Sequence, residues 1–355
     1  MSTRRDFIKK SASLAALSAA GFIPGKGFGF GGMGRPAPET EWMEFSVAHW
    51  NPNPKRMQLT KMMGVLGGVS GSGGDAAARK KEFEDAGLKW TVLEGVNLTR
   101  AQLGVEGRDE NIEQFIDLIK ECSEVGQKII CYNWMPAVSW SRSNSSAPSR
   151  GGSKVTRFDI EDANTELTRY GDDFTHEDLW ENMEYFLNAV VPEAEKYDVK
   201  LALHPDDPPI DRLRGIPRII TSVDALKRVT QLYDSPYNGL TFCQGSIASQ
   251  GKDVDIPAAI RWFGERDLIH FVHFRDVRGT PTNFEETWHD DGQNDMYEAM
   301  KAYYDVGFRG PIRPDHVPGI TGYENTDSVG YTDLGLLFAV GYIRGLMEAV
   351  IKSSS

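Results

Sequence analysis

Four residues that can bind a transition metal stand at the ends of short apolar segments in the second half of the chain. They are His204, Cys243, His273 and Asp315. Imidazole, thiolate and carboxylate ligands together favour a divalent transition metal such as Zn, Fe or Mn over Mg or Ca. A single histidine or cysteine in such a place is more often structural. Four of these residues at four successive segment ends predict a metal site.

Two residues near these candidates could transfer protons. His316 directly follows Asp315 and could act as a titrating acid or base beside a metal. Tyr331 precedes the last predicted helix, and its phenol could donate or accept a proton. A surface histidine is the alternative interpretation of His316.

Three further residues are candidate contacts for a substrate. Arg275 stands two residues after His273, so in an extended strand both would point to one face, where Arg275 could bind a substrate carboxylate. By the same alternation His270 and His273 would point to opposite faces. Asn133, at the end of an apolar segment, and His289, in Trp-His-Asp-Asp-Gly, are candidate polar contacts, with a structural role as the alternative for each.

Strand-like and helix-like segments alternate eight times from residue 44 onward. The strand-like segments are apolar, often β-branched or aromatic, and bounded by Gly, Pro or Asn. The helix-like segments repeat apolar residues at the i, i+3, i+4 spacing of an amphipathic helix. The predicted strands are Glu44–Trp50, Gly64–Ser70, Lys89–Glu94, Lys128–Asn133, Lys200–His204, Gly239–Cys243, Leu268–Phe274 and Pro311–Asp315. The predicted helices are Met57–Met63, Ala76–Ala86, Asn111–Val125, Glu177–Lys196, Val223–Tyr233, Ile256–Arg266, Asp295–Val306 and Leu334–Ile351.

This strict alternation predicts a (β/α)8 barrel, or TIM barrel, as one catalytic domain over residues 41–355. Functional side chains of such barrels lie at the C-terminal ends of the strands, where the four candidate ligands stand. A doubly wound open sheet is the alternative. It is disfavoured because no Gly-rich phosphate-binding motif follows an early strand.

The connection Met135–Thr175 is the longest departure from regular connection length. Because it follows the C-terminal end of a strand, we expect it to lie over the barrel mouth. Long connections there are commonly lids or oligomer contacts, and a disordered surface loop is the alternative. We also expect a homo-oligomer.

The composition limits the kinds of partner. The 355 residues carry a formal net charge of −12, which argues against nucleic acid, because binding phosphates requires a basic face. No run of about 18 apolar residues occurs, so no membrane span is predicted. Cys122 and Cys131 are interpreted as small buried apolar residues, since three cysteines do not make a disulfide framework.

The first 40 residues differ from the rest. Arg4 and Arg5 precede the weakly apolar, small-residue segment Ser11–Ile23, an arrangement that resembles a twin-arginine export signal. Lys26–Thr40, rich in Gly and Pro, is interpreted as a linker. We therefore expect a periplasmic protein that takes up its metal in the cytoplasm before export. A chance basic N-terminus on a cytoplasmic protein is the alternative.

Several short motifs resemble the mannonate dehydratase family. The most specific is His-Pro-Asp-Asp-Pro-Pro at residues 204–209. The others are Cys-Tyr-Asn-Trp-Met-Pro at 131–136, Phe-Val-His-Phe-Arg at 271–275, His-Asp-Asp-Gly at 289–292, Asp-Met-Tyr-Glu at 295–298 and Arg-Pro-Asp-His at 313–316. The motifs occur in order, and the resemblance extends from about Glu44 to the C-terminus.

The resemblance implies a TIM-barrel hydro-lyase with a divalent Mn or Fe ion. The family removes water from D-mannonate to give 2-keto-3-deoxygluconate. By resemblance, the metal ligands are His204, Cys243, His273 and Asp315, and the proton-transfer residues are His316 and Tyr331. One of these two would remove the proton next to the carboxylate, the other would protonate the departing hydroxyl, and the metal would stabilise the enediolate.

Three segments depart from the family pattern. His-Trp-Asn-Pro at 49–52 stands where the family usually has Arg-Trp-aromatic-Gly. Asn-Leu-Thr-Arg at 97–100 replaces a Val-His-Glu element, and Ser-Trp-Ser-Arg at 139–142 replaces Asp-Trp-Thr-Arg. The metal half of the pattern is retained and the half expected to face the sugar is altered, so a related aldonate is an alternative substrate.

Two other functions use the same residues differently. A metal-dependent sugar isomerase or epimerase would abstract a proton at the same site and retain the hydroxyl. A non-catalytic periplasmic binding protein for sugar acids would bind without turnover, but the intact ligand set and proton-transfer residues disfavour it.

Overall fold

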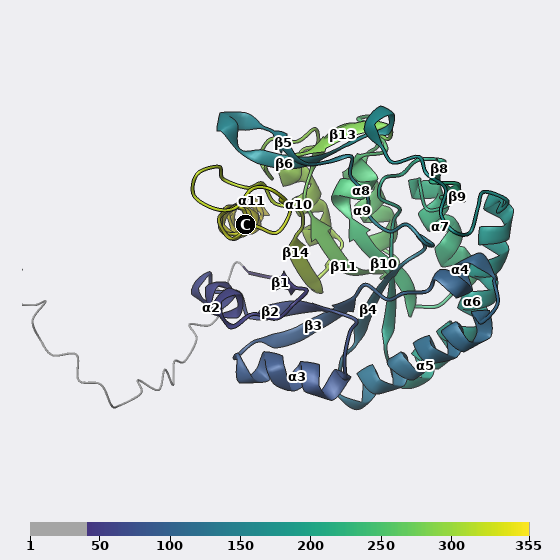
Figure 1. Ribbon diagram of the computed structural model, residues 1–355. Helices are drawn as coiled ribbons and strands as arrows, with labels where there is room; N and C mark the ends of the chain where they lie inside the picture. Colours follow the sequence, from purple (N-terminus) through teal and green to yellow (C-terminus); the bar gives the residue numbers. More distant parts are fainter. Residues whose placement is uncertain (1–40, 355) are drawn as a thin grey trace, which may run out of the picture. The chain divides into compact units, whose positions relative to one another are not determined.

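Eight parallel strands close into a barrel in the computed structural model, which describes residues 41–354 (Figure 1). The strands are β1 (Glu44–His49), β2 (Gly67–Gly71), β3 (Lys89–Glu94), β4 (Ile129–Asn133), β7 (Lys200–His204), β10 (Asn238–Cys243), β11 (Ile269–Phe274) and β14 (Pro311–Pro314). Each pairs with the next along this list, and β1 pairs with β14. The predicted TIM barrel is therefore confirmed, and its closure excludes the open sheet. The segment predicted as an export signal and linker, residues 1–40, lies outside the described residues.

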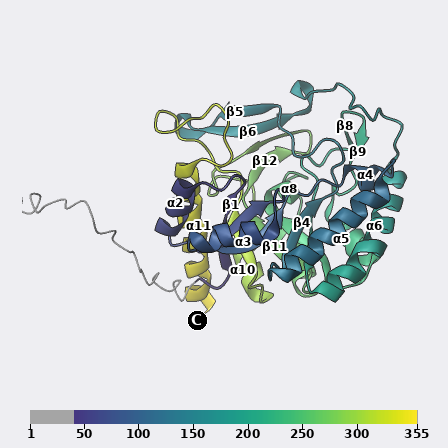
Figure 2. The ribbon, with the colours of Figure 1, turned by 60° about the horizontal axis from the view of Figure 1, so that its bottom comes forward.

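One main helix follows each barrel strand and covers its outer face (Figures 1 and 2). Short helices α4 (Thr99–Leu103) and α8 (Gln244–Ala248), which the sequence did not predict, precede two of them. The main helices are α2 (Pro54–Met62), α3 (Ala76–Asp85), α5 (Arg108–Glu124), α6 (His176–Tyr197), α7 (Val223–Leu232), α9 (Ile256–Gly264), α10 (Met296–Asp305) and α11 (Asp333–Ser354).

The core has two layers. The inside of the barrel is filled by a small cluster that includes Val69, Val92, Cys131 and Phe271. A larger cluster fills the space between the strands and the helices, where the apolar faces of helices such as α5 and α6 are buried. Cys122 and Cys131 are both buried and unoxidised, as the sequence predicted.

Helix α11 is long and apolar enough to cross a membrane by length and composition, the only such helix in the described part of the chain. It is also the eighth helix of the barrel. Leu336, Ala339, Val340 and Ile343 are buried on its inner face, and the helix packs against α10 and β14. Its position in the barrel accounts for its apolar composition.

The connection Met135–Thr175 contains strands that the sequence did not predict. β5 (Asn144–Pro148) and β6 (Lys154–Asp159) form an antiparallel sheet with the hairpin of β12 (Val277–Thr280) and β13 (Asn283–Glu286), in the order β12-β13-β6-β5. Short one-turn helices η1 (Arg150–Gly152) and η2 (Ile160–Asp162) complete the connection. This sheet lies at the barrel mouth (Figures 1 and 2). The sequence Asn-Ser-Ser-Ala-Pro of β5 has none of the β-branched or aromatic residues that predict a strand. It is a strand because it pairs with β6 in the folded protein.

The predicted strand Gly64–Ser70 is shifted. Gly64 has a positive φ of 72° and ends the turn after α2, so β2 begins only at Gly67. The alternation in β11 is as predicted: His273 lines the cavity at the mouth, whereas His270 lies between the carbonyls of Leu201 and Pro236, 2.9 and 3.0 Å away.

Candidate active site

A cavity of about 510 Å³ opens at the C-terminal ends of the barrel strands. This volume is typical of sites for small molecules. Most of the residues predicted to do chemistry share this cavity: His204, His273, Asp315, His316, Tyr331 and Asn133 all line it.

Three of the predicted metal ligands come together at this cavity. The ligand atoms of His204, Cys243 and His273 all lie within 4.8 Å of one another, close enough for one ion to reach all three. The Nδ1 atom of His204 lies 2.6 Å from the carbonyl of Pro205. That contact places the ring proton on Nδ1 and leaves the Nε2 lone pair of His204 available for a ligand bond.

Asp315 adjoins this group. Its Oδ2 atom lies 3.8 Å from the Cys243 sulfur and 3.8 Å from His273 Nδ1. Arg275 Nε donates to Oδ2 over 2.7 Å, and Arg313 Nη1 donates to Oδ1 over 2.6 Å. A carboxylate oxygen has two lone pairs, so Oδ2 retains one toward the cysteine and the histidine. Asp315 thus lies beside the three grouped residues, whose nitrogen and sulfur donors fit a divalent transition metal.

Burial alone would raise the pKa of Asp315, but the positive charges of Arg313, His316, His273 and Arg275 hold this pKa well below its ordinary value. The carboxylate is therefore ionised throughout the physiological range. An ionised carboxylate is the form that a metal ligand requires.

Two other groups in the described residues have ligand-like spacing. In the first, Glu94 is bound by the Arg313 guanidinium at 3.1 and 3.3 Å, and the Cys131 sulfur accepts a hydrogen bond from Thr241. Burial also raises the pKa of the Cys131 thiol well above its ordinary value, so it is protonated. In the second, Asp207 and Glu286 are both paired with arginines.

His316 is held by a buried carboxylate. Its Nδ1 atom lies 2.9 Å from Glu286 Oε1, and its side chain is 9% exposed. The contact places the ring proton on Nδ1, which leaves Nε2 as the basic atom. Its backbone has a positive φ of 29°, uncommon for a residue other than glycine and frequent at functional sites.

Tyr331 also lines the cavity, and its ring contacts the His316 ring edge-to-face, with ring centroids 5.6 Å apart. Its hydroxyl donates a hydrogen bond to Asp315 Oδ1 over 3.1 Å. Burial, and then the negative charge of Asp315, raise the pKa of Tyr331 well above its ordinary value. The phenol is therefore protonated and able to act as a hydrogen-bond or proton donor.

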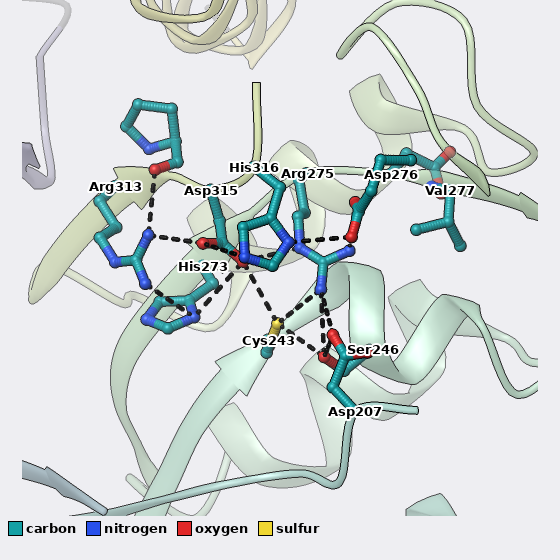
Figure 3. Close-up of polar contacts among 12 residues, drawn as sticks. Asp207, Cys243, Ser246, His273, Arg275, Asp276, Val277, Arg313, Asp315 and His316 are labelled. Carbon is teal, nitrogen blue, oxygen red and sulfur yellow. Dashed lines mark hydrogen bonds and ion pairs between the residues drawn. The ribbon is translucent and has the colours of Figure 1, made fainter. Parts of the chain in front are cut away.

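Arg275 lies beneath the cavity and does not line it. Its guanidinium is 1% exposed and pairs with Asp315 at 2.7 Å and with Asp207 at 2.8 Å (Figure 3). It also pairs with Glu286 at 2.7 Å. All of its nitrogens thus serve other protein groups. The prediction that Arg275 binds a substrate carboxylate is not supported by this placement; Arg275 instead joins Asp315 to the carboxylates behind His316.

Arg142 reaches the same carboxylates from the connection between β4 and α6. It donates to Asp207 Oδ2 over 3.1 Å and also to Glu286, and its side chain is 2% exposed. The ring of the neighbouring Trp140 packs on the His316 ring, with ring centroids 4.9 Å apart. The connection predicted to lie over the barrel mouth therefore completes the wall around His316.

The two remaining predicted contacts differ in position. Asn133 lines the cavity at the end of β4, where its Oδ1 atom accepts a hydrogen bond from the Met135 amide. His289 is fully buried and does not line the cavity, so the structure does not support its predicted contact with substrate. Burial lowers the pKa of His289 to about 4, which makes it a neutral core residue.

Sequence reasoning missed five residues that hold the site together. Asp207 had a signal in the acidic run after His204, and Glu94 and Arg313 stand at strand ends. Arg142 stands in the Ser-Trp-Ser-Arg segment that was compared with the family pattern, but nothing there predicted its carboxylate partners. Glu286 had no signal, because a hairpin strand brings it to the mouth only through tertiary folding. The five residues are Glu94, Arg142, Asp207, Glu286 and Arg313.

Comparisons with known proteins agree on one family. The family model for D-mannonate dehydratase (UxuA) matches residues 73–169 and 160–355. A mannonate dehydratase from Thermotoga petrophila is 37% identical over 308 residues, which cover 77% of this chain and 84% of that protein. The chain belongs to the mannonate dehydratase family.

Solved structures are consistent with this. The crystal structure of the mannonate dehydratase from Streptococcus suis serotype 2 superposes with a TM-score of 0.80 at 33% identity, covering 88% of this chain and 94% of that one. A 3-keto-D-glucoside 4-epimerase from E. coli superposes with a TM-score of 0.59 at 14% identity, covering 85% of this chain and 99% of the other. The second likeness shows the shared barrel fold alone.

Membership of the mannonate dehydratase family makes the chain a hydro-lyase that dehydrates a sugar acid. The family implies a divalent metal, and the ligand atoms of His204, Cys243 and His273 lie close enough together to hold one. The predicted family and reaction class are confirmed.

Proposed function

We propose that this protein dehydrates D-mannonate, or a closely related aldonate, to the corresponding 2-keto-3-deoxy acid in the cavity at the barrel mouth. One observation carries the proposal. His316 and Tyr331, a base and an acid by their hydrogen bonds, lie in edge-to-face contact, with ring centroids 5.6 Å apart, beside a group of metal donors.

The metal is proposed to be Mn or Fe, held by His204, Cys243, His273 and Asp315. The mixed nitrogen, sulfur and oxygen donors support this assignment over Mg or Ca. Bound there, the ion would supply Lewis-acid stabilisation of negative charge that develops on the substrate's oxygens.

The residues of the chain are proposed to move the protons. His316, with its proton fixed on Nδ1 by Glu286, accepts the proton from carbon 2 of the aldonate at Nε2. Tyr331 gives its proton to the hydroxyl on carbon 3, whose C–O bond breaks as water leaves. The resulting enol becomes the 2-keto acid by proton transfer to carbon 3, and Asn133 is proposed to contact the substrate's hydroxyls.

The experiment is turnover of a panel of aldonic acids, D-mannonate included, by protein reconstituted with Mn or with Fe. Formation of a 2-keto-3-deoxy acid from one member is the expected result. Conversion to an isomer of unchanged mass would instead support a sugar isomerase or epimerase. Binding without turnover across the panel would support a binding protein.

We also propose that the protein is exported to the periplasm and forms a homo-oligomer. The paired arginines Arg4 and Arg5, followed by a short apolar segment, support export. Cell fractionation of the native chain and of an Arg4→Lys/Arg5→Lys variant tests this: the native chain should be periplasmic and the variant cytoplasmic. Light scattering of the purified protein measures the oligomeric state, and a monomer would contradict the proposal.

A further inference from the structure

Two further cavities adjoin the catalytic cavity over the ends of β3 and β4. The second cavity, of about 280 Å³, shares Gly95, Asn133, Met135 and Ser139 with the catalytic cavity. The third, of about 630 Å³, shares Asn97, Thr99 and Ala137 with the second. The shared residues make the three cavities neighbours, and the row that they form, from the metal donors to the outer rim of the barrel mouth, is called the groove below.

The far end of this groove is basic. Arg100, Arg169 and Arg214 line the third cavity, and no acidic residue does. Within the described part of the chain, Arg169 and Arg214 have no carboxylate partner: Arg169 donates to the Tyr170 hydroxyl over 2.6 Å, and Arg214 to the Glu166 carbonyl over 2.8 Å. Arg100 pairs at 3.0 Å with Glu110, which is 64% exposed. In a protein of net charge −12, this is a local site for an anion.

The two unpaired arginines are held beside each other by backbone contacts. The amide of Thr168 donates to the Arg214 carbonyl over 3.2 Å, which joins the turn before Arg169 to the hairpin of β8 (Arg212–Leu213) and β9 (Ile216–Pro217). Arg214 occupies the first turn position of this hairpin with a positive φ of 53°. Asn or Gly is usual there, so the arginine stands where turn geometry alone would not favour it.

The near end of the groove differs in charge. Each carboxylate at the catalytic cavity has an arginine partner: Asp207 and Asp315 pair with Arg275, and Glu94 pairs with Arg313. No positive charge is left there for an additional acidic group of a long substrate. Among the described residues that line the three cavities, such a group would find arginines without a carboxylate partner only at the far end.

We propose that the groove binds a sugar acid extended by a further acidic sugar, whose carboxylate is held by Arg169 and Arg214. This inference rests on the proposed function. The dehydration breaks bonds at carbons 2 and 3 of the aldonate, so a glycosidic link farther along the carbon chain leaves the reacting end unchanged. The substrate class is thus a short anionic oligosaccharide that ends in an aldonic acid.

Calorimetric titration of the full-length, metal-loaded protein tests the inference. Trigalacturonate serves as the extended anionic probe, galacturonate as the single acidic sugar and cellotriose as the neutral chain. We expect trigalacturonate to bind at least tenfold more tightly than galacturonate, and its affinity to fall with added salt. Cellotriose should not compete with trigalacturonate for binding.

The test variant combines Arg169→Gln with Arg214→Gly, since glycine keeps the positive φ of that turn. The control variant is Arg309→Ser. Arg309 precedes β14 on the opposite face of the barrel and is also exposed. We expect the double variant to lose at least tenfold in affinity for trigalacturonate and Arg309→Ser to lose none.

Equal affinities for trigalacturonate and galacturonate, equally tight binding of cellotriose, or a double variant within twofold of the native protein would each overturn the inference. Turnover of D-mannonate by the same preparation reports on the proposed function separately, because it requires none of the three probes.

Discussion

The two halves of the barrel mouth are built on different principles. On the side of β7, β10, β11 and β14, the functional residues are buried and tightly paired: Arg275 and Arg313 hold the Asp315 carboxylate at 2.7 and 2.6 Å. On the side of β1 to β4, the wall includes exposed residues such as Asn97, Ser139 and Trp140, and two further cavities adjoin the first. The three departures from the family pattern all fall on the side of β1 to β4. Proton transfer requires side chains held in a fixed geometry, whereas substrate binding tolerates variation in exposed loop residues.

The largest expected effect is a loss of turnover when a residue on the buried side is changed. His316→Asn removes the proposed base, so kcat should fall by about a hundredfold to ten-thousandfold with the metal content unchanged. The control is His176→Asn, an exposed histidine paired with Asp211 at 3.0 Å, which should keep full activity. Steady-state kinetics with metal analysis measures both. A His316→Asn enzyme with native kcat would show that the proton is removed by another group.

The second prediction concerns the link between the two halves. Arg142→Gln leaves Asp207 and Glu286 with one cationic partner fewer in a buried place, which should cost about 3–5 kcal/mol of unfolding free energy. The matched control is Arg150→Gln, in the same connection, whose pair with Asp290 is 42% and 34% exposed and should contribute about 1 kcal/mol or less. Denaturant unfolding at neutral pH compares them. Equal losses in the two variants would contradict a special role for Arg142.

As the pH falls, the protein should first lose stability because buried neutral histidines become protonated on unfolding, before the paired carboxylates titrate. Burial, with Arg56 nearby, lowers the pKa of His49 from 6.5 to about 4, and burial, with Lys200 nearby, lowers that of His270 from 6.5 to about 3. Between pH 6.5 and about 4 the unfolded chain therefore binds more protons than the folded one, so stability falls as the pH falls. The pKa of Asp315 lies well below its ordinary value, so its ion pairs persist over this interval.

Thermal unfolding across this pH interval measures the loss. A His49→Gln variant should show a shallower decline in Tm than the native protein, because one neutral histidine no longer titrates on unfolding. An unchanged decline would assign the acid sensitivity to other groups.

The smallest effect is expected on the open side. Ser139→Ala changes an exposed wall residue shared by the first two cavities, so KM for the substrate should change by less than about tenfold and kcat should hardly change. Initial-rate kinetics separates the two constants. A hundredfold fall in kcat would show that the open side also takes part in the chemistry.

The sequence predicted the fold and the buried ligands because both follow local rules. Apolar segments that end in His204, Cys243 and His273 have the period and boundaries of barrel strands, and strand ends converge at one face. Placing His273 inside and His270 outside required only the alternation of a strand.

What the sequence did not predict depends on contacts between distant segments. Glu286 and His316 are 30 residues apart and Arg142 and Glu286 are 144 apart, so no spacing rule brings them together. The side chain of Arg275 points toward the barrel mouth, as strand alternation predicted, but its guanidinium pairs with three carboxylates of the protein. The alternation of a strand gives the direction of a side chain and not its hydrogen-bond partners. The strand β5 exists only because β6 pairs with it.

The most direct test of the account is the product formed from D-mannonate by the Mn- or Fe-reconstituted protein, identified by mass spectrometry. The account predicts a product lighter than the substrate by one water, with a 2-keto group, whose formation is lost in His316→Asn. A product of unchanged mass would contradict dehydration at this site and assign the same residues to isomerisation.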